Sequence, residues 1–166
     1  AASLVGNNET IFLGSGTTVL EIARNVRDHK NLTVITNSLP VLNVLAGLQE
    51  ITVISLGGML RESELSFIGH ITEQSLTEVR VDKVFMGTRG LSLEHGLTND
   101  YLQETLTDRA ILKIGREVVI VADHSKVNRV STVLLAPLNS MHTFVTDSKV
   151  DKKFVQALKR EGIQVV

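Results

Sequence analysis

The 166-residue sequence contains no cysteine, and this absence removes several kinds of chemistry at once. Disulfide bonds, thiolate-bound metals and a cysteine nucleophile are all excluded. A protein of the reducing cytoplasm has no need of disulfides, so we expect a cytoplasmic location.

Long apolar runs and an excess of positive charge are also missing. The longest apolar stretches, such as residues 118–122, are far shorter than the roughly 18–20 residues of a membrane-spanning helix. The N-terminal segment lacks the basic and apolar regions of a signal peptide. The formal net charge is −1, whereas a surface that grips nucleic acid usually carries a marked positive excess. We therefore expect no membrane segment and no direct contact with DNA by these residues.

What the sequence does contain is a regular alternation of short apolar runs and amphipathic segments. We expect strands at residues 10–13, 32–36, 51–55, 82–88 and 117–123, with shorter ones at 131–136, 142–146 and 163–166. We expect helices at residues 17–27, 39–46, 66–78, 102–114 and 151–160, the third capped by Ser66 with Phe67, Ile71, Ser75 and Leu76 facing inward. A loop rich in glycine and asparagine precedes the fourth helix. This order predicts one α/β domain, in which helices cover both faces of a mostly parallel sheet.

In such sheets, ligands bind beyond the carboxyl ends of the strands. Residues Gly14-Ser15-Gly16-Thr17-Thr18 follow the first strand and lead directly into a helix. Glycine allows close backbone approach, and a helix N-terminus directs free N–H groups at an anion. The loop is neither a Walker A loop nor a complete GxGxxG fingerprint. Both a phosphate site and a plain tight turn with a threonine cap fit these residues.

The other strand ends carry small, polar or charged residues as well. They are Thr36, Asn37 and Ser38; Gly57, Gly58 and Arg61; Gly87, Thr88, Arg89 and Gly90; and Asp123, His124, Ser125 and Lys126. Taken singly, each group also fits a turn or a helix cap. Together they indicate one anionic, hydroxyl-rich ligand such as a sugar phosphate, with Lys126 as the counter-ion.

Catalytic and metal-binding patterns are weak. The five histidines show no HExxH spacing, so we expect no metal site and no cofactor. Asp123, Glu104 and Lys126 could serve an aldose–ketose isomerisation, which needs a carboxylate base and a charge that steadies the enediolate. Asp108 shares a helical face with Glu104, where a solvated or ion-paired position is the simpler interpretation.

The motifs in their order along the chain resemble one family closely. These are "IFLGSGTT", "LTVITNSLPV", "ISLGGMLR", "SFIGHITEQSL", "DKVFMGTRGLSLEHGLT", "ADHSK" and "FVTD". The chain resembles the C-terminal effector-sensing domain of DeoR-type bacterial transcriptional repressors, whose fold is similar to ribose-5-phosphate isomerase and the CoA-transferase group. The resemblance covers residues from about Thr10 to Val166. It implies that residues 1–166 form a single sensing domain and not an enzyme.

The resemblance also implies partners. A phosphorylated sugar effector would bind this domain and change how an N-terminal winged helix-turn-helix, absent from these residues, holds operator DNA. Such repressors commonly regulate sugar uptake and catabolism and form homo-oligomers. The missing initiator Met agrees with a fragment of a longer protein.

Carried over by motif, the family's site residues form a phosphate cradle, a sugar-lining group and a closing group. The cradle is Gly14, Ser15, Gly16, Thr17 and Thr18; the sugar-lining group is Thr36, Asn37, Ser38, Gly57 and Gly58; the closing group is Gly87, Thr88, Arg89, Gly90, Glu104 and Lys126.

Two positions depart from the family pattern. Gly14 stands where the family often has a polar residue, and Arg89 stands where "GxDG" would place Asp. Arg89 would reverse the local charge, which suggests a ligand with a second anionic group. An isomerase of the ribose-5-phosphate type remains the alternative to a sensor. A CoA- or nucleotide-binding enzyme is a weaker alternative, because the usual loops are absent.

Overall fold

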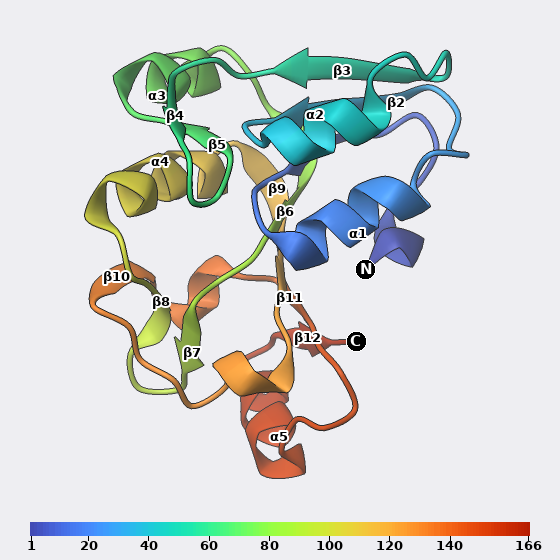
Figure 1. Ribbon diagram of the computed structural model, residues 1–166. Coiled ribbons are helices and arrows are strands. Elements are labelled where there is room, and N and C mark those ends of the chain that lie inside the picture. The colour runs from blue at the N-terminus through green and yellow to red at the C-terminus, as the bar shows by residue number, and fades with distance from the viewer.

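The computed structural model describes residues 1–166, and its centre is a seven-stranded parallel sheet (Figure 1). The strand order is β12-β11-β9-β6-β1-β2-β3. The strands are β1 (Thr10–Leu13), β2 (Leu32–Thr36), β3 (Ile51–Ser55), β6 (Val81–Met86), β9 (Gly115–Val121), β11 (Thr143–Val145) and β12 (Gln164–Val165). All six neighbouring pairs run parallel, which confirms the predicted α/β fold class.

Five α-helices flank this sheet, and none of them combines the length and apolar character needed to cross a membrane. They are α1 (Thr17–Asn25), α2 (Leu39–Leu45), α3 (His70–Thr77), α4 (Leu102–Leu112) and α5 (Lys152–Arg160). Short 3-10 turns lie at Ala2–Leu4, His124–Lys126 and Leu138–Ser140.

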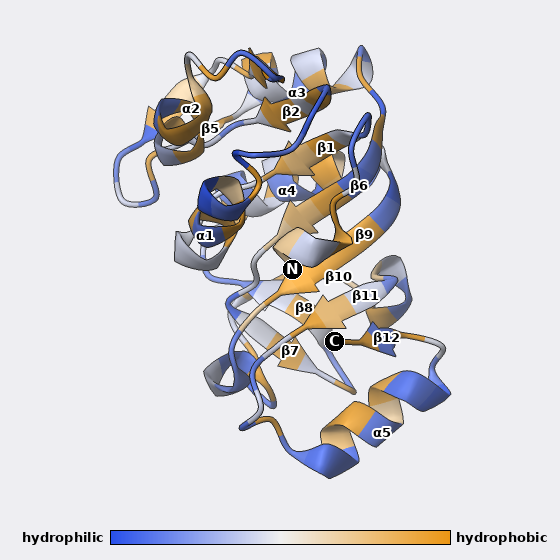
Figure 2. Ribbon diagram, turned by 90° about the vertical axis from the view of Figure 1, so that its right-hand side faces the viewer, coloured by the Kyte–Doolittle hydropathy of each residue, from blue (hydrophilic) through white to orange (hydrophobic).

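The core lies on both faces of the sheet because successive strand residues point to opposite sides. In β1, Phe12 joins one buried cluster while Ile11 and Leu13 join the other. The same alternation in β6 sends Val84 to the first cluster and Phe85 to the second. Helices α1 and α2 cover the second cluster, whereas α3, α4 and α5 contribute to the first. Figure 2 shows the resulting hydrophobic character of the central strands β6 and β9.

The structure also contains two smaller sheets. Strands β4 (Met59–Arg61) and β5 (Ser66–Ile68) form an antiparallel hairpin, and β7 (Gly90–Ser92), β8 (Gly96–Asn99) and β10 (Val133–Ala136) form an antiparallel sheet in the order β10-β8-β7. The segment expected to be a glycine- and asparagine-rich loop therefore contains β7 and β8.

The helix predicted for residues 66–78 was wrong in its first turn. Ser66–Ile68 pairs with β4 instead, and Gly69 then adopts φ 91° before α3 begins at His70. The buried face consequently shifts: Ile71 is 64% exposed, whereas Thr72 and Leu76 are buried. Ser66 resembles a helix cap locally, but strand pairing across the hairpin decides its conformation.

Helix α5 offers a simple test of local capping. The side chain of Asp151 accepts a hydrogen bond from the backbone N–H of Lys153 at 2.9 Å. Replacing Asp151 with Ala should lower the free energy of unfolding by about 1 kcal/mol, as other N-cap losses do. Urea denaturation measures the change. Asp28→Ala is the control, since Asp28 is exposed and makes no side-chain hydrogen bond; equal stabilities for the two variants would contradict the capping role.

Candidate functional site

A cavity of about 380 Å³ opens at the carboxyl edge of the main sheet, where β1, β6 and β9 end side by side. Along the chain, β1 leads to β2, which lies beside it on one side of the sheet. The next strand of the main sheet after β6 is β9, which lies beside β6 on the opposite side. The strand order therefore reverses between β1 and β6. This reversal is where open α/β sheets place their ligands.

The loop between β1 and α1 presents unpaired N–H groups to the cavity. Gly16 is the N-cap of α1, with φ 104° and ψ 156°, a conformation that glycine adopts without strain. No side chain caps the helix, and the first helical hydrogen bond runs from Leu20 N–H to the Gly16 carbonyl at 3.0 Å. The backbone N–H groups of Thr17, Thr18 and Val19 thus have no acceptor in the protein. They face a cavity and carry the positive end of the helix dipole, which suits an anion.

The end of β9 supplies a cation. Lys126 lines the cavity, is half-buried and makes no ion pair. Asp123 lines the same wall, and its carboxylate accepts a hydrogen bond from Ser125 N–H at 2.7 Å. Hydrogen bonds from Ser125 and the nearby Lys126 charge lower the pKa of Asp123. Asp123 is thus an anion near Lys126, but it forms no ion pair with the lysine, whose ammonium group can still contact a ligand.

The end of β6 has a different role. Arg89 forms an ion pair with Glu64, and its Nε lies 4.0 Å from a carboxylate oxygen of Asp100. Its charge is thus balanced by two acidic side chains. The Thr88 hydroxyl lies 2.9 Å from the Gly90 carbonyl and 3.1 Å from the Thr98 carbonyl, so it stabilises the turn into β7.

The remaining wall is acidic and comes largely from α4. Glu104 has an 11% exposed side chain and forms an ion pair with Arg61. Asp108 lies one turn further along α4 and accepts a hydrogen bond from the Asn99 amide at 2.9 Å. Burial, followed by the charge of Glu104, raises the pKa of Asp108 well above its ordinary value. Asp108 forms no ion pair, so that part of the expectation was wrong, and its half-buried side chain lines the cavity.

The structure brings the predicted site residues together only in part. Those that line the cavity are Ser15, Gly16, Thr17, Thr18, Gly87, Thr88, Arg89, Glu104 and Lys126. Those that do not line it are Gly14, Thr36, Asn37, Ser38, Gly57, Gly58 and Gly90. The strand ends of β2 and β3 account for most of the second group.

Those two strand ends lie apart from the cavity because the β4–β5 hairpin occupies them. The Asn37 amide donates to the Phe67 carbonyl at 3.0 Å, and Phe67 N–H donates to the Asn37 carbonyl at 2.7 Å. Thr36 donates its hydroxyl to the Leu13 carbonyl at 2.6 Å, and Ser38 caps α2. These hydrogen bonds serve the fold, whereas the Asn37 Oδ1 is buried without a hydrogen-bond partner.

The glycines outside the cavity also have structural partners. Gly57 accepts a hydrogen bond from the Thr72 hydroxyl at 2.7 Å, and a Cβ on Gly58 would lie 2.2 Å from that hydroxyl oxygen. A Cβ on Gly90 would lie 2.5 Å from the Arg129 carbonyl oxygen. Gly14 donates its N–H to the Phe85 carbonyl at 3.0 Å, which ties the β1 loop to β6.

Sequence reasoning missed Ser63, Glu64 and Asn99 as cavity residues. Ser63 and Glu64 lie in the turn of the β4–β5 hairpin, and Asn99 ends β8. They reach the cavity because their segments fold back over the sheet edge, and no local sequence pattern carried that information.

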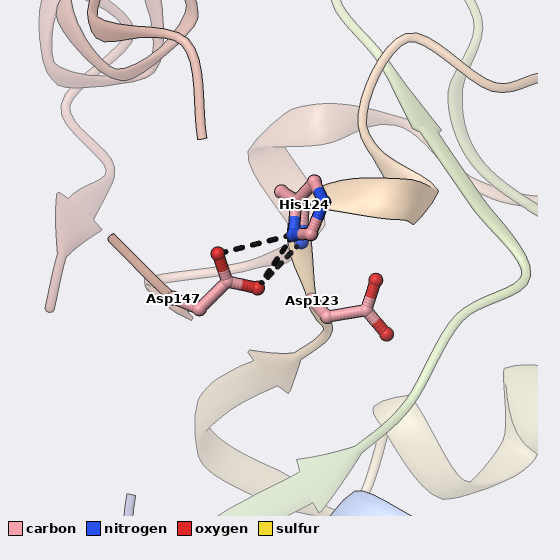
Figure 3. Close-up of side chains that lie close together, drawn as sticks. All are labelled: Asp123, His124 and Asp147. Atoms are coloured by element: carbon pink, nitrogen blue, oxygen red, sulfur yellow. Dashed lines mark hydrogen bonds and ion pairs between the residues drawn. The ribbon is translucent and has the colours of Figure 1, made fainter. Parts of the chain in front are cut away.

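A separate cluster of Asp123, His124 and Asp147 lies at the ends of β9 and β11 (Figure 3). Asp147 accepts a hydrogen bond from His124 N–H at 3.0 Å and lies 3.0 to 3.1 Å from the imidazole Nδ1. These hydrogen bonds lower the pKa of Asp147 to about 2. The cluster links two neighbouring strand ends and so fixes the turn that carries Lys126.

Comparisons with known proteins agree with this architecture. The family described as "DeoR C terminal sensor domain" matches residues 1–148. The HTH-type transcriptional regulator IolR of Bacillus subtilis (strain 168) is 32% identical over 165 residues, covering 99% of this chain and 66% of that protein. The glycerol-3-phosphate regulon repressor of Escherichia coli (strain K12) is 30% identical over 164 residues, covering 99% of this chain and 65% of that protein.

Solved structures show the same fold in enzymes. Ribose 5 phosphate isomerase A from Neisseria gonorrhoeae superposes with a TM-score of 0.55 at 19% identity, over 76% of this chain and 49% of that one. This likeness concerns the fold alone. The chain spans about two thirds of the length of the two regulators above. On the match over residues 1–148, the chain belongs to the family of DeoR C-terminal sensor domains.

Proposed function

We propose that this sensor domain binds a phosphorylated sugar in the switch-point cavity. The observation that carries the proposal is the pairing of free N–H groups at Thr17, Thr18 and Val19 with the unpaired cation of Lys126. A phosphate would accept hydrogen bonds from these N–H groups and balance the charge of Lys126. The hydroxyl of Ser15 lies in the same wall and adds a further donor.

Binding would act on DNA through a separate part of the protein. The relatives are HTH-type regulators or repressors that extend beyond the matched region. We therefore propose that the effector favours one arrangement of a homo-oligomer, and that N-terminal helix-turn-helix domains report this arrangement at the operator. A ligand shifts such an equilibrium only by its difference in affinity for the two states. Operator binding by the longer protein, measured with and without the effector, tests this step.

An isomerase activity is disfavoured by the state of the acidic residues. Two carboxylates are candidates for the base of an isomerase. Arg61 holds Glu104 in an ion pair, and the hydrogen bonds from Ser125 lower the pKa of Asp123, which makes it a weaker base. Arg89 and Glu64 neutralise each other on the facing wall. A coupled assay for interconversion of ribose 5-phosphate and ribulose 5-phosphate decides the matter, and measurable turnover would overturn the sensor proposal.

Sugar phosphates should stabilise the domain against heat through Lys126. A ligand at 100 times its Kd should add about 2.7 kcal/mol to the free energy of unfolding. Lys126→Ala should weaken binding roughly tenfold or more, because a hydrogen bond to a charged group is lost. The measurement is a thermal-shift titration with phosphorylated pentoses and hexoses.

The matched control for this titration is Lys159→Ala on the exposed side of α5, which should bind as the unchanged protein does. Equal ligand responses in the two lysine variants would mean that the phosphate lies elsewhere.

A further inference from the structure

Asp108 is the cavity carboxyl that the proposed phosphate site leaves without a role. It projects from α4, which packs on one face of the main sheet, whereas the phosphate-binding loop leads into α1 on the other face. Residues of both the phosphate-binding loop and α4 line the cavity, so its two ends differ in chemistry. The α1 end offers N–H donors and Lys126, and the α4 end offers carboxyl groups and an amide.

The orientation of the Asn99 amide is defined by its hydrogen bonds. Its Oδ1 accepts from the backbone N–H of Arg89 at 3.2 Å, so its Nδ2 must point toward Asp108, where it donates to Oδ2 at 2.9 Å. The other Asp108 oxygen, Oδ1, has no hydrogen-bond partner in the protein, and it is not sealed from the cavity. One oxygen of the carboxyl is therefore free for a ligand.

The charged groups around Asp108 are already paired with one another. Glu104 on α4 is bound to Arg61 of β4, and Glu64 of the hairpin turn is bound to Arg89 after β6. Arg109 on α4 donates to the carbonyls of Leu134 and Leu135. Asp108 forms no ion pair of its own, which favours its protonated form; the raised pKa agrees with this. A carboxylic acid can both donate to and accept from a neutral oxygen.

We infer that Asp108, oriented by Asn99, binds a neutral hydroxyl or carbonyl oxygen at the unphosphorylated end of the effector and so selects monophosphorylated sugars. The inference rests on the proposed phosphate site. A second anionic group would find no free cation at this end of the cavity, because Arg61 and Arg89 are already bound to Glu104 and Glu64, so the cost of removing its charge from water would not be offset. Asp108 is thus a specificity-determining residue of the cavity.

Arg89 was expected from the sequence to favour a ligand with a second anionic group, but its contacts favour the opposite preference. A free arginine at that position would favour a second phosphate, but the ion pair with Glu64 and the nearby Asp100 already balance its charge. A bisphosphate would have to break that ion pair before Arg89 could contact it. We therefore expect monophosphates to bind more tightly than the matching bisphosphates.

Titration calorimetry with three kinds of probe tests the inference. Inorganic phosphate reports the α1 end alone, and two matched pairs report both ends: fructose 6-phosphate with fructose 1,6-bisphosphate, and ribulose 5-phosphate with ribulose 1,5-bisphosphate. The protein should bind one of these monophosphates at least about tenfold more tightly than inorganic phosphate and its bisphosphate. Monophosphates that bind no better than inorganic phosphate would overturn the inference.

Variants separate the two ends of the cavity. Asp108→Leu should lose about tenfold in affinity for the monophosphate while inorganic phosphate binds within about twofold of its original affinity. Unchanged phosphate binding also shows that the variant is folded; Asp108→Ala replaces it if it is not. Asp108→Asn keeps a donor and an acceptor and should retain binding, as should the control Asp28→Asn.

The failures are distinguishable. If inorganic phosphate and all sugar phosphates fail to bind the unchanged protein, the proposed function itself is wrong, and the inference is overturned with it. If they bind but Asp108→Leu discriminates as the unchanged protein does, only the role of Asp108 is wrong.

Discussion

Replacing Arg61 with Met should lower the free energy of unfolding by about 2–4 kcal/mol, because it leaves Glu104 without its cation in a nearly buried position. The Glu104 side chain is 11% exposed, and that of Arg61 is 22% exposed. The other donor to Glu104 is the Ser66 hydroxyl, at 3.3 Å, which is neutral and cannot balance the charge. The guanidinium also stacks over Tyr101, 4.6 Å from the ring centroid, and this contact is lost as well.

The matched control is the exposed ion pair between Arg24 and Glu21, whose side chains are 53% and 60% exposed. Arg24→Met should cost no more than about 0.5 kcal/mol, as solvent-exposed helical pairs do. Urea denaturation of both variants measures the difference. If Arg61→Met is as mild as Arg24→Met, the Arg61–Glu104 pair does not hold the cavity wall.

A double-mutant cycle separates the pair from its surroundings. Glu104→Gln combined with Arg61→Met should be less destabilising than Arg61→Met alone, since no uncompensated charge is then buried. Such coupling would show that β4 and α4 are joined electrostatically at the cavity, as the geometry indicates.

Local patterns were sufficient to predict the strands of the main sheet and the residues that follow them. Apolar runs such as residues 51–55 became strands with the expected bounds, because a parallel sheet buried on both faces selects β-branched apolar residues. The order of the strands is a different matter, since it depends on contacts between distant segments. Only β1, β6 and β9 end beside one another at the cavity, and this adjacency decides which polar residues line it.

The hairpin of β4 and β5 marks the limit of local prediction. Ser66 has the residue type of a helix cap, and nothing in residues 66–68 distinguishes a helical first turn from a short strand. Pairing with Met59–Arg61 decides in favour of the strand. The same hairpin is hydrogen-bonded to Asn37 and brings Glu64 to Arg89. Because residues 66–68 were predicted as helix, the hairpin was not predicted, and neither was the part of the cavity lining that its turn supplies.

Asp108 illustrates how partner assignment escapes sequence analysis. The helical spacing correctly places Glu104 and Asp108 on one face of α4, and both line the cavity. The spacing does not reveal that Arg61 forms an ion pair with Glu104, or that the only hydrogen bond to the Asp108 carboxyl comes from the Asn99 amide. The difference between the two carboxyl groups therefore arises from tertiary contacts made by β4 and β8.

Asp108 should also make the stability of the protein fall as pH rises. Its pKa is raised in the folded state by burial and by the charges of Glu104 and Glu64, against the opposing effects of Arg61 and the Asn99 amide. Between the unfolded pKa, about 4, and the higher folded pKa, the folded protein holds a proton that the unfolded chain lacks. The free energy of unfolding then decreases by up to about 1.4 kcal/mol for each pH unit over that interval.

Asp108→Asn removes this titration while keeping the size and hydrogen-bonding capacity of the side chain. The variant should match the unchanged protein near pH 4 and become the more stable of the two as pH rises through the folded pKa of Asp108. Asp147 titrates in a separate, more acidic interval, because its lowered pKa of about 2 makes stability fall as pH decreases. Urea denaturation from about pH 4 to pH 8 measures the difference, with Asp28→Asn as control. Parallel pH profiles for Asp108→Asn and the unchanged protein would mean that Asp108 is ionised throughout, and its acidic wall would then repel any ligand oxygen that cannot donate a proton.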